Sequence, residues 1–320
     1  MSDASSLAEG VRSGDRRSLA RAVTLVESTR TDDREQAVAL LEELHGAGAP
    51  AVRIGISGAP GVGKSTFIEA LGCHLVDAGH RVAVLAVDPS STRSGGSILG
   101  DKTRMSELAR RPEAFIRPSP SGGDLGGVAA RTGEALLLCE AAGFDVVLVE
   151  TVGVGQSEVA VADLVDTFVL LVSPGGGDEL QGVKRGIMEL ADLVVVTKAD
   201  GDLLPAARRA EADHRHAVHF LRRRFEEWAP RVLAVSSVEG TGVAEVWTAL
   251  GEHHDALDGS GALAALRASQ AVTAFWREVE RGLLARLRAG SGGDHLDALV
   301  AEVQDGRTSP AVAAWQALAT

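Results

Sequence analysis

The chain has 320 residues, 45% of them hydrophobic, which is enough for one large α/β domain with helical additions. Its formal net charge of −12 argues against a surface that binds nucleic acid or an anionic membrane, because such partners require concentrated Lys and Arg. The sequence has no apolar run near the roughly 18 residues of a membrane span and no signal-peptide pattern, so we expect a cytoplasmic protein.

Helical spacing of apolar residues dominates residues 13–45 and ends at the G-A-G-A-P of residues 46–50. From there, short apolar runs alternate with helical stretches, and the runs occupy residues 52–57, 81–87, 145–149, 167–172, 193–197 and 232–235. Such runs are typical of a mostly parallel sheet flanked by helices. We therefore predict an α/β domain over residues 51–255, with helical extensions over residues 1–50 and 256–320.

Residues 58–66 read G-A-P-G-V-G-K-S-T, a complete phosphate-binding loop between a predicted strand and a predicted helix. The three glycines allow positive φ angles, so successive N–H groups can point at a phosphate beside a helix N-terminus. Lys64 can reach the β- and γ-phosphates, and the Ser65 hydroxyl can ligate Mg²⁺. The loop predicts a P-loop NTPase but does not choose between ATP and GTP. The predicted nucleotide contacts here are Gly58, Ala59, Pro60, Gly61, Val62, Gly63, Lys64, Ser65 and Thr66.

Two of the predicted strands end in a carboxylate. The run F-D-V-V-L-V-E ends at Glu150, which can reach Mg²⁺ through a metal-bound water, and Gly153 can bring its N–H to a γ-phosphate. The other strand ends at Asp88, and the glycine-rich loop that follows it contains Asp101. Because Mg²⁺ prefers an octahedron of oxygens, both aspartates are candidate ligands. Taken alone, residues 90–105 suit a solvated loop as well as a switch.

The sequence L-V-V-V-T-K-A-D places Lys198 and Asp200 just after a buried strand, where a nucleotide-binding sheet reads its base. A carboxylate there can accept the N1–H and 2-amino protons of guanine, whereas adenine offers neither, so GTP is favoured. The Lys198 stem can cover the base or the ribose. Thr197 stands where GTPases usually have asparagine, and its hydroxyl can replace only part of the amide's hydrogen bonds.

The predicted C-terminal arm carries an apolar stripe between residues 263 and 287. The stripe can pack against the parent domain, or it can form a homodimer contact.

Five segments closely resemble the MeaB/ArgK family of P-loop GTPases: the phosphate loop, V-D-P-S-S, G-G-S-I-L-G-D-K-T-R-M, E-T-V-G-V-G-Q-S-E and the G-G-G-D-E-L-Q-G-V-K-R-G-I-M-E-L-A-D that begins at residue 175. The family members are chaperones of adenosylcobalamin-dependent acyl-CoA mutases, chiefly methylmalonyl-CoA mutase. The resemblance spans about residues 52–243. It implies GTP and GDP as nucleotides, Mg²⁺ as cofactor and such a mutase as partner.

The resemblance also assigns roles to individual residues. It implies Ser65, Asp88, Asp101 and Glu150 as the magnesium site, and a mutase-responsive switch over residues 175–184. In that switch, Asp178 and Lys184 are the natural charged contacts. Arg104 is a candidate charge toward the nucleotide or the partner, and Ser236, Ser237 and Val238 are similar to the family's remaining base-contacting loop. The predicted catalytic residues are Lys64, Arg104, Glu150 and Lys184.

Two other functions remain open at this point. One is a small-molecule kinase, which would need an acceptor pocket and a base near the γ-phosphate, and no such signature stands out. The other is a metallochaperone GTPase for nickel or another metal. Its Cys/His clusters have no clear counterpart, because His214, His216 and His219 are expected to lie on a solvated helix face.

Overall fold

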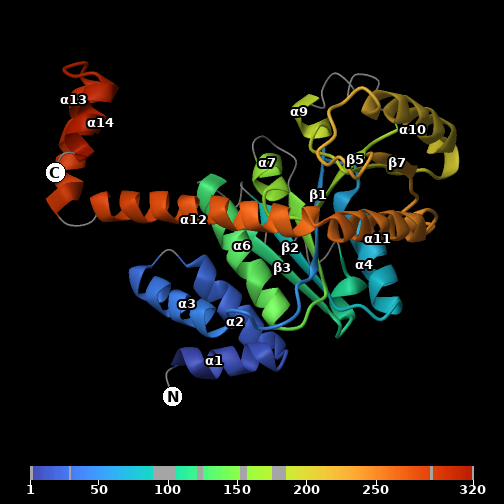
Figure 1. Ribbon diagram of the computed structural model, residues 1–320, viewed down its shortest axis with the longest axis horizontal. Coiled ribbons are helices and arrows are strands. Elements are labelled where there is room, and N and C mark those ends of the chain that lie inside the picture. Colours follow the sequence, from blue (N-terminus) through green and yellow to red (C-terminus); the bar gives the residue numbers. More distant parts are fainter. Residues whose placement is uncertain are drawn as a thin grey trace. The chain divides into compact units, whose positions relative to one another are not determined.

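The computed structural model describes residues 3–28, 30–88, 105–120, 125–151, 157–174, 185–288 and 291–318 (Figure 1). The predicted Asp101, Arg104, Gly153, Asp178 and Lys184 lie outside these ranges. The chain divides into two compact units, Met1–Gln270 and Ala271–Thr320. The domain limits expected from the sequence stay predictions.

The described residues of the first unit contain one seven-stranded sheet, in the order β3-β2-β4-β1-β5-β6-β7, and all of its strand pairs are parallel. The sheet confirms the predicted α/β fold class. Strand β1 lies between β4 and β5, so the loop after β1 emerges at the middle of the sheet's carboxyl edge. The strands are β1 (Val52–Gly58), β2 (Val82–Asp88), β3 (Ala114–Pro120), β4 (Val146–Thr151), β5 (Thr167–Val172), β6 (Leu193–Val196) and β7 (Arg231–Ala234).

Strand β3 was not expected from the sequence. It reads A-F-I-R-P-S-P and pairs only with β2, at the edge of the sheet. Proline has no N–H to donate to a ladder, so Pro118 is tolerated at an edge but not in a central strand. The interruption of the apolar run by Arg117 and Pro118 hid this strand.

Successive residues of the strands point to opposite faces, and each face is buried under different helices. In β2, for example, Val82 and Val84 belong to one core cluster, whereas Ala83 and Leu85 belong to the other. Helices α4 (Lys64–Asp77) and α11 (Val243–Ser260) pack on the first face. Helices α6 (Leu125–Ala141), α7 (Ser157–Ala162), α9 (Arg185–Met188) and α10 (Leu204–Val218) contribute to the second, giving three layers.

The N-terminal helices extend the second core cluster. They are α1 (Asp3–Arg12), α2 (Arg16–Glu27) and α3 (Thr31–Glu43). The helical stretch predicted over residues 13–45 is thus two helices, and α1 precedes it. Asp15 caps α2 by accepting a hydrogen bond from Ser18 N at 2.7 Å. Figure 1 shows these helices beside α6, where Arg34 forms an ion pair with Glu134 at 2.6 Å.

After α11 the described chain is helical only, with α12 (Ala262–Arg288), α13 (Ser291–Gln304) and α14 (Pro310–Leu318). The first turns of α12 belong to the sheet-containing unit, where Arg267 donates two hydrogen bonds to the buried Asp166 and one to Ala51 O. Two short 3₁₀ turns complete the described elements, η1 (Leu108–Arg110) and η2 (Gly201–Leu203). Among the described helices none has the length and apolarity needed to cross a bilayer.

Candidate nucleotide site

The predicted phosphate loop connects β1 to α4 at the centre of the sheet. Gly58 has φ 156°, and a Cβ there would lie 2.6 Å from Leu171 O of β5, so only glycine lets the loop leave the sheet this way. Gly63 has φ 100° and is the N-cap of α4, which aims the helix N-terminus at the loop. These backbone angles are those of a concave N–H cradle, the arrangement that binds phosphate in P-loop proteins.

Lys64 is the first residue of α4, and its side chain is buried under the loop. Its ammonium donates hydrogen bonds to Gly58 O at 2.7 Å and Ala59 O at 3.1 Å. Burial lowers the pKa of Lys64, whereas the nearby carboxylates of Glu150 and Glu158 act in the opposite direction. The ammonium therefore lies at the loop, where the β- and γ-phosphates of a bound nucleotide are expected.

Ser65 and Glu150 meet at the end of β4. Ser65 Oγ lies 3.4 Å from Glu150 Oε1, and Glu150 is largely buried. Asp88 ends the neighbouring strand, since Val87 pairs with Thr151 in the sheet register. The side chain of Asp88, like Asp101, lies outside what the structure describes.

Hard oxygen donors of this kind suit Mg²⁺, which is typically held by one or two protein side chains with waters and phosphate oxygens. In keeping with that pattern, the described residues contain no group of three or more His, Cys, Asp or Glu that could hold a metal by itself. The residues present thus fit a magnesium ion shared with a triphosphate. Ser65 and Glu150 are the described residues that would hold it.

The loop after β6, residues 197–200, which the sequence predicts to be a base-reading loop, is hydrogen-bonded to the phosphate loop. Thr197 is 2% exposed, and its Oγ1 lies 2.7 Å from Val62 O and 3.2 Å from Val172 O. Lys198 Nζ donates to Gly61 O at 2.7 Å, with the Lys198 backbone at φ 55°. Because the Thr197 hydroxyl has one hydrogen, it can donate a hydrogen bond to one carbonyl at a time, whereas the two N–H groups of an asparagine amide could donate to both. Thr197 thus supplies the tether in part, in agreement with the sequence prediction.

Asp200 is aimed by a neighbouring serine. Ser236 Oγ, which is buried, donates to Asp200 Oδ2 at 2.6 Å and itself accepts from Glu239 N at 3.1 Å. Ser236 is therefore an orienting residue for the carboxylate in this structure, whereas the sequence suggested a contact to the base. Val238 extends into solvent and Ser237 is half-buried, so both are accessible to a ligand.

One buried carboxylate of this region was missed by the sequence reasoning. Glu158 lies in the first turn of α7 and is 3% exposed, although its position in V-G-V-G-Q-S-E suggests an ordinary polar loop. The signal that could have found it is a lone glutamate at the start of the apolar helix S-E-V-A-V-A, which follows β4 in the chain.

The histidines of α10 do not form a metal site within the described chain. His216 and His219 are exposed, as expected, but His214 is buried, and this burial lowers its pKa. The expectation that all three lie on a solvated face was wrong for His214, because its helix turn faces the sheet together with Ala207 and Val218.

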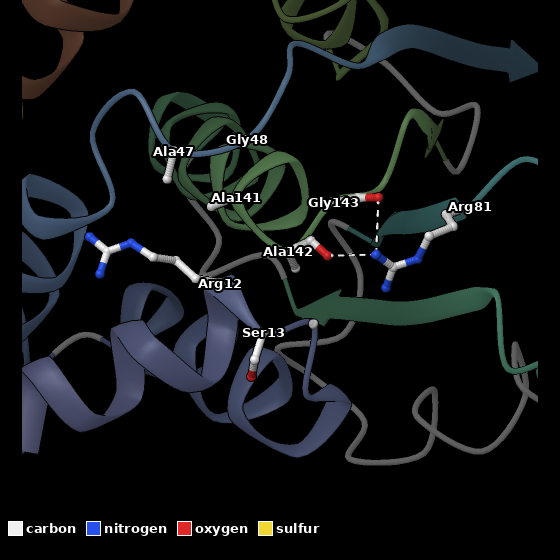
Figure 2. A pocket seen from close by; sticks show the side chains of 9 residues that line it. Arg12, Ser13, Ala47, Gly48, Arg81, Ala141, Ala142 and Gly143 are labelled. Atoms are coloured by element: carbon white, nitrogen blue, oxygen red, sulfur yellow. Dashed lines mark hydrogen bonds between the residues drawn. The ribbon is translucent and has the colours of Figure 1, made fainter.

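A cavity of about 480 Å³ lies elsewhere, between the α1–α2 turn and the end of α6 (Figure 2). Arg81 donates there to Ala142 O at 2.9 Å and to Gly143 O at 3.2 Å. Figure 2 shows the Arg12 side chain directed away from Arg81, and Arg12 donates to Glu43 O. Since the two cations do not converge, this hollow is a structural junction of the N-terminal helices.

The chain is similar to known proteins over nearly its whole length. The family model described as "Methylmalonyl Co-A mutase-associated GTPase MeaB" matches residues 19–292. A probable GTPase of Mycobacterium tuberculosis is 55% identical over 313 residues, covering 98% of this chain and 93% of that protein. The Mus musculus protein named "Methylmalonic aciduria type A homolog, mitochondrial" is 51% identical, covering 95% of this chain and 76% of its own length.

Among solved structures, one described as a LAO/AO transport system kinase has a TM-score of 0.77 and 39% identity, with 99% of this chain and 97% of that chain covered. The likeness to that structure therefore covers nearly the whole of both chains. The chain belongs to the MeaB family of methylmalonyl-CoA mutase-associated P-loop GTPases.

Proposed function

We propose that this protein binds GTP with Mg²⁺ and hydrolyses it to GDP and phosphate. The observation that carries the proposal is the fastening of the base-reading loop to the phosphate loop, through Thr197 to Val62 and Lys198 to Gly61. A carboxylate held by Ser236 at Asp200 can accept both guanine protons at once. Adenine would leave that carboxylate unmatched, at a cost of roughly 1–3 kcal/mol.

Hydrolysis at such a site is mainly positioning and charge neutralisation. Lys64 neutralises the β- and γ-oxygens, and a magnesium ion bound by Ser65 and Glu150, with Asp88 and Asp101, would withdraw further charge. Gly153 is proposed to contact the γ-phosphate.

We further propose that the GTPase is a chaperone that gates adenosylcobalamin loading and protects an acyl-CoA mutase, methylmalonyl-CoA mutase or a close relative. The family description and the mouse relative's name support such a partner. In this proposal the mutase brings Lys184 or Arg104 into the site. GTPase assays of Lys184→Ala with and without the mutase test this step, and undiminished stimulation by the mutase would remove Lys184 from it.

A kinase is the alternative function, and the description of the solved relative as a LAO/AO transport system kinase favours it. The two activities differ in their products, because a GTPase releases one inorganic phosphate for each GTP consumed, whereas a kinase transfers it to an acceptor. Equal amounts of phosphate and GDP in the absence of any acceptor support the GTPase. GTP consumption only on addition of a small-molecule acceptor, without phosphate release, supports the kinase.

The C-terminal unit is proposed to join two copies of the chain. Val272, Phe275, Trp276, Leu283 and Leu284 are all at least half exposed on α12. Burying such a stripe against a second copy removes a large apolar area from water, which is the main driving force of a symmetric interface.

The cytoplasmic location stays a prediction from composition.

A further inference from the structure

Glu158 is a buried carboxylate to which the site described above assigns no role. Its side chain is 3% exposed, and its Oε2 has no hydrogen-bond partner within the described ranges. Two other buried carboxylates of this unit, Asp166 and Glu140, are each held by several donors. Asp166 accepts from Arg267 and Arg53 N, and Glu140 accepts from Arg53 and Ala51 N. A buried acceptor oxygen without a hydrogen bond costs folding free energy. The presence of such an oxygen at Glu158 therefore indicates that a bound ligand donates a hydrogen bond to it.

The fold holds Glu158 beside the phosphate loop. Helix α7 packs on the strand that leads into the loop, because Gly55 of β1 has no side chain: a Cβ there would lie 3.0 Å from Val161 Cγ1 of α7 and 2.9 Å from Val165 Cγ2, which follows the helix. Burial lowers the pKa of the Lys64 ammonium, and two nearby carboxylates, Glu150 and Glu158, act to raise it. Of these, Glu150 lies 3.4 Å from Ser65 Oγ, on the metal side of the site. Glu158 is therefore a second carboxylate near the Lys64 ammonium, which we expect at the γ-phosphate end of a bound nucleotide.

We propose that Glu158 is a catalytic residue that orients the water attacking the γ-phosphate. Its free oxygen accepts a hydrogen bond from that water. The water oxygen forms a bond to the γ-phosphorus, and the bond from phosphorus to the β–γ bridging oxygen breaks, leaving its electron pair on GDP. The released water proton passes by way of the carboxylate to phosphate or solvent, so GTP and water give GDP, inorganic phosphate and a proton. This role rests on the GTP hydrolysis proposed above.

The test compares Glu158→Ala and Glu158→Gln in single-turnover hydrolysis of pre-bound GTP by the full chain. Removing one positioned catalytic group typically lowers a rate by 10²–10⁴-fold. We expect Glu158→Ala to lower the rate by about 100-fold, with the Kd for GTP and the Mg²⁺ concentration for half-maximal activity both within about threefold of wild type. Glu158→Gln keeps an acceptor oxygen in the same shape and is expected to be at least about tenfold faster than Glu158→Ala. Formate, which fits the space vacated in Glu158→Ala, is expected to restore part of its rate.

Glu140→Gln is the matched control, because Glu140 is a buried carboxylate paired with Arg53 at the opposite, amino-terminal edge of the sheet. Its single-turnover rate is expected to equal that of wild type at a temperature where thermal melts show all variants folded. An unchanged rate in Glu158→Ala would overturn the proposal. So would a parallel loss of GTP affinity, or a raised Mg²⁺ requirement, since these would indicate a binding or metal role. Wild-type protein that binds GTP without hydrolysing it would overturn the proposed function as well, whereas hydrolysis that Glu158→Ala leaves intact would overturn this role alone.

Discussion

Thr197→Val removes the hydroxyl that fastens the base-reading loop to the phosphate loop and changes little else. The side chain is 2% exposed, and valine has the same branched shape as threonine. Val172 O keeps its hydrogen bond from Thr197 N at 2.9 Å. Val62 O, which lies 2.7 Å from the hydroxyl, loses that donor.

One carbonyl without its donor sets the size of the effect. Leaving a buried acceptor unsatisfied costs about 1–3 kcal/mol, and the lower end applies because only one of the two carbonyls is affected. A cost of about 1.4 kcal/mol is a factor of ten in affinity. If the phosphate loop must hold its present shape to bind nucleotide, Thr197→Val is expected to weaken GDP binding about fivefold to tenfold.

The assay is an equilibrium titration with a fluorescent GDP analogue, which avoids hydrolysis. Thr197→Ser keeps the hydroxyl and is the matched control. Thr197→Asn offers two N–H donors, so it is expected to bind at least as tightly as wild type. If Thr197→Val and Thr197→Ser bind GDP within twofold of each other, the hydroxyl is not the tether described here.

Three further changes test other parts of the molecule. Asp200→Asn should weaken GTP binding and improve binding of xanthosine triphosphate, whose C2 carbonyl needs a donor; competition titrations that show an unaltered preference would refute the base assignment. Burial lowers the pKa of His253 to about 4, so between about pH 6.5 and 4 the unfolded chain takes up a proton that the folded chain does not, and stability falls as the pH drops. His253→Asn removes this effect, so the unfolding free energy of wild type should fall over that pH range by on the order of 3 kcal/mol more than that of the variant. An equal fall in unfolding free energy for both proteins, measured by denaturant titration at each pH, would argue against it. Phe275→Glu combined with Trp276→Glu should convert a dimer to a monomer in sedimentation velocity, and an unchanged mass would rule out pairing through α12.

The layered fold could be predicted because its strands are apolar on both faces, which is a local property of the sequence. The phosphate loop could also be predicted, since the pattern G-A-P-G-V-G-K-S-T between a strand and a helix determines the backbone conformation of the loop. Strand β3 could not be read, because Arg117 and Pro118 interrupt its apolar run, and only pairing with β2 makes it a strand.

The site was predictable in its residue types but not in its contacts. No sequence pattern near Thr197 indicates that its hydrogen-bond partner is Val62, because the two residues are 135 positions apart. Similarly, Ser236 was expected near the base, but whether it contacts guanine or aims Asp200 depends on how two loops are folded together. The burial of Glu158 could not be predicted, because it depends on how α7 packs against the sheet, a tertiary arrangement that no local sequence pattern specifies.

The loops after β1 and β6 are proposed to form one site that binds a magnesium triphosphate and selects guanine. Isothermal titration of the purified full chain with GTP, GDP and ATP, each with and without Mg²⁺, tests both properties. We predict GTP binding that Mg²⁺ strengthens, and ATP binding weaker by at least about tenfold, as expected from an unmatched carboxylate at Asp200. No measurable heat with GTP and Mg²⁺, or equal affinities for GTP and ATP, would refute a guanine-selective site in this protein.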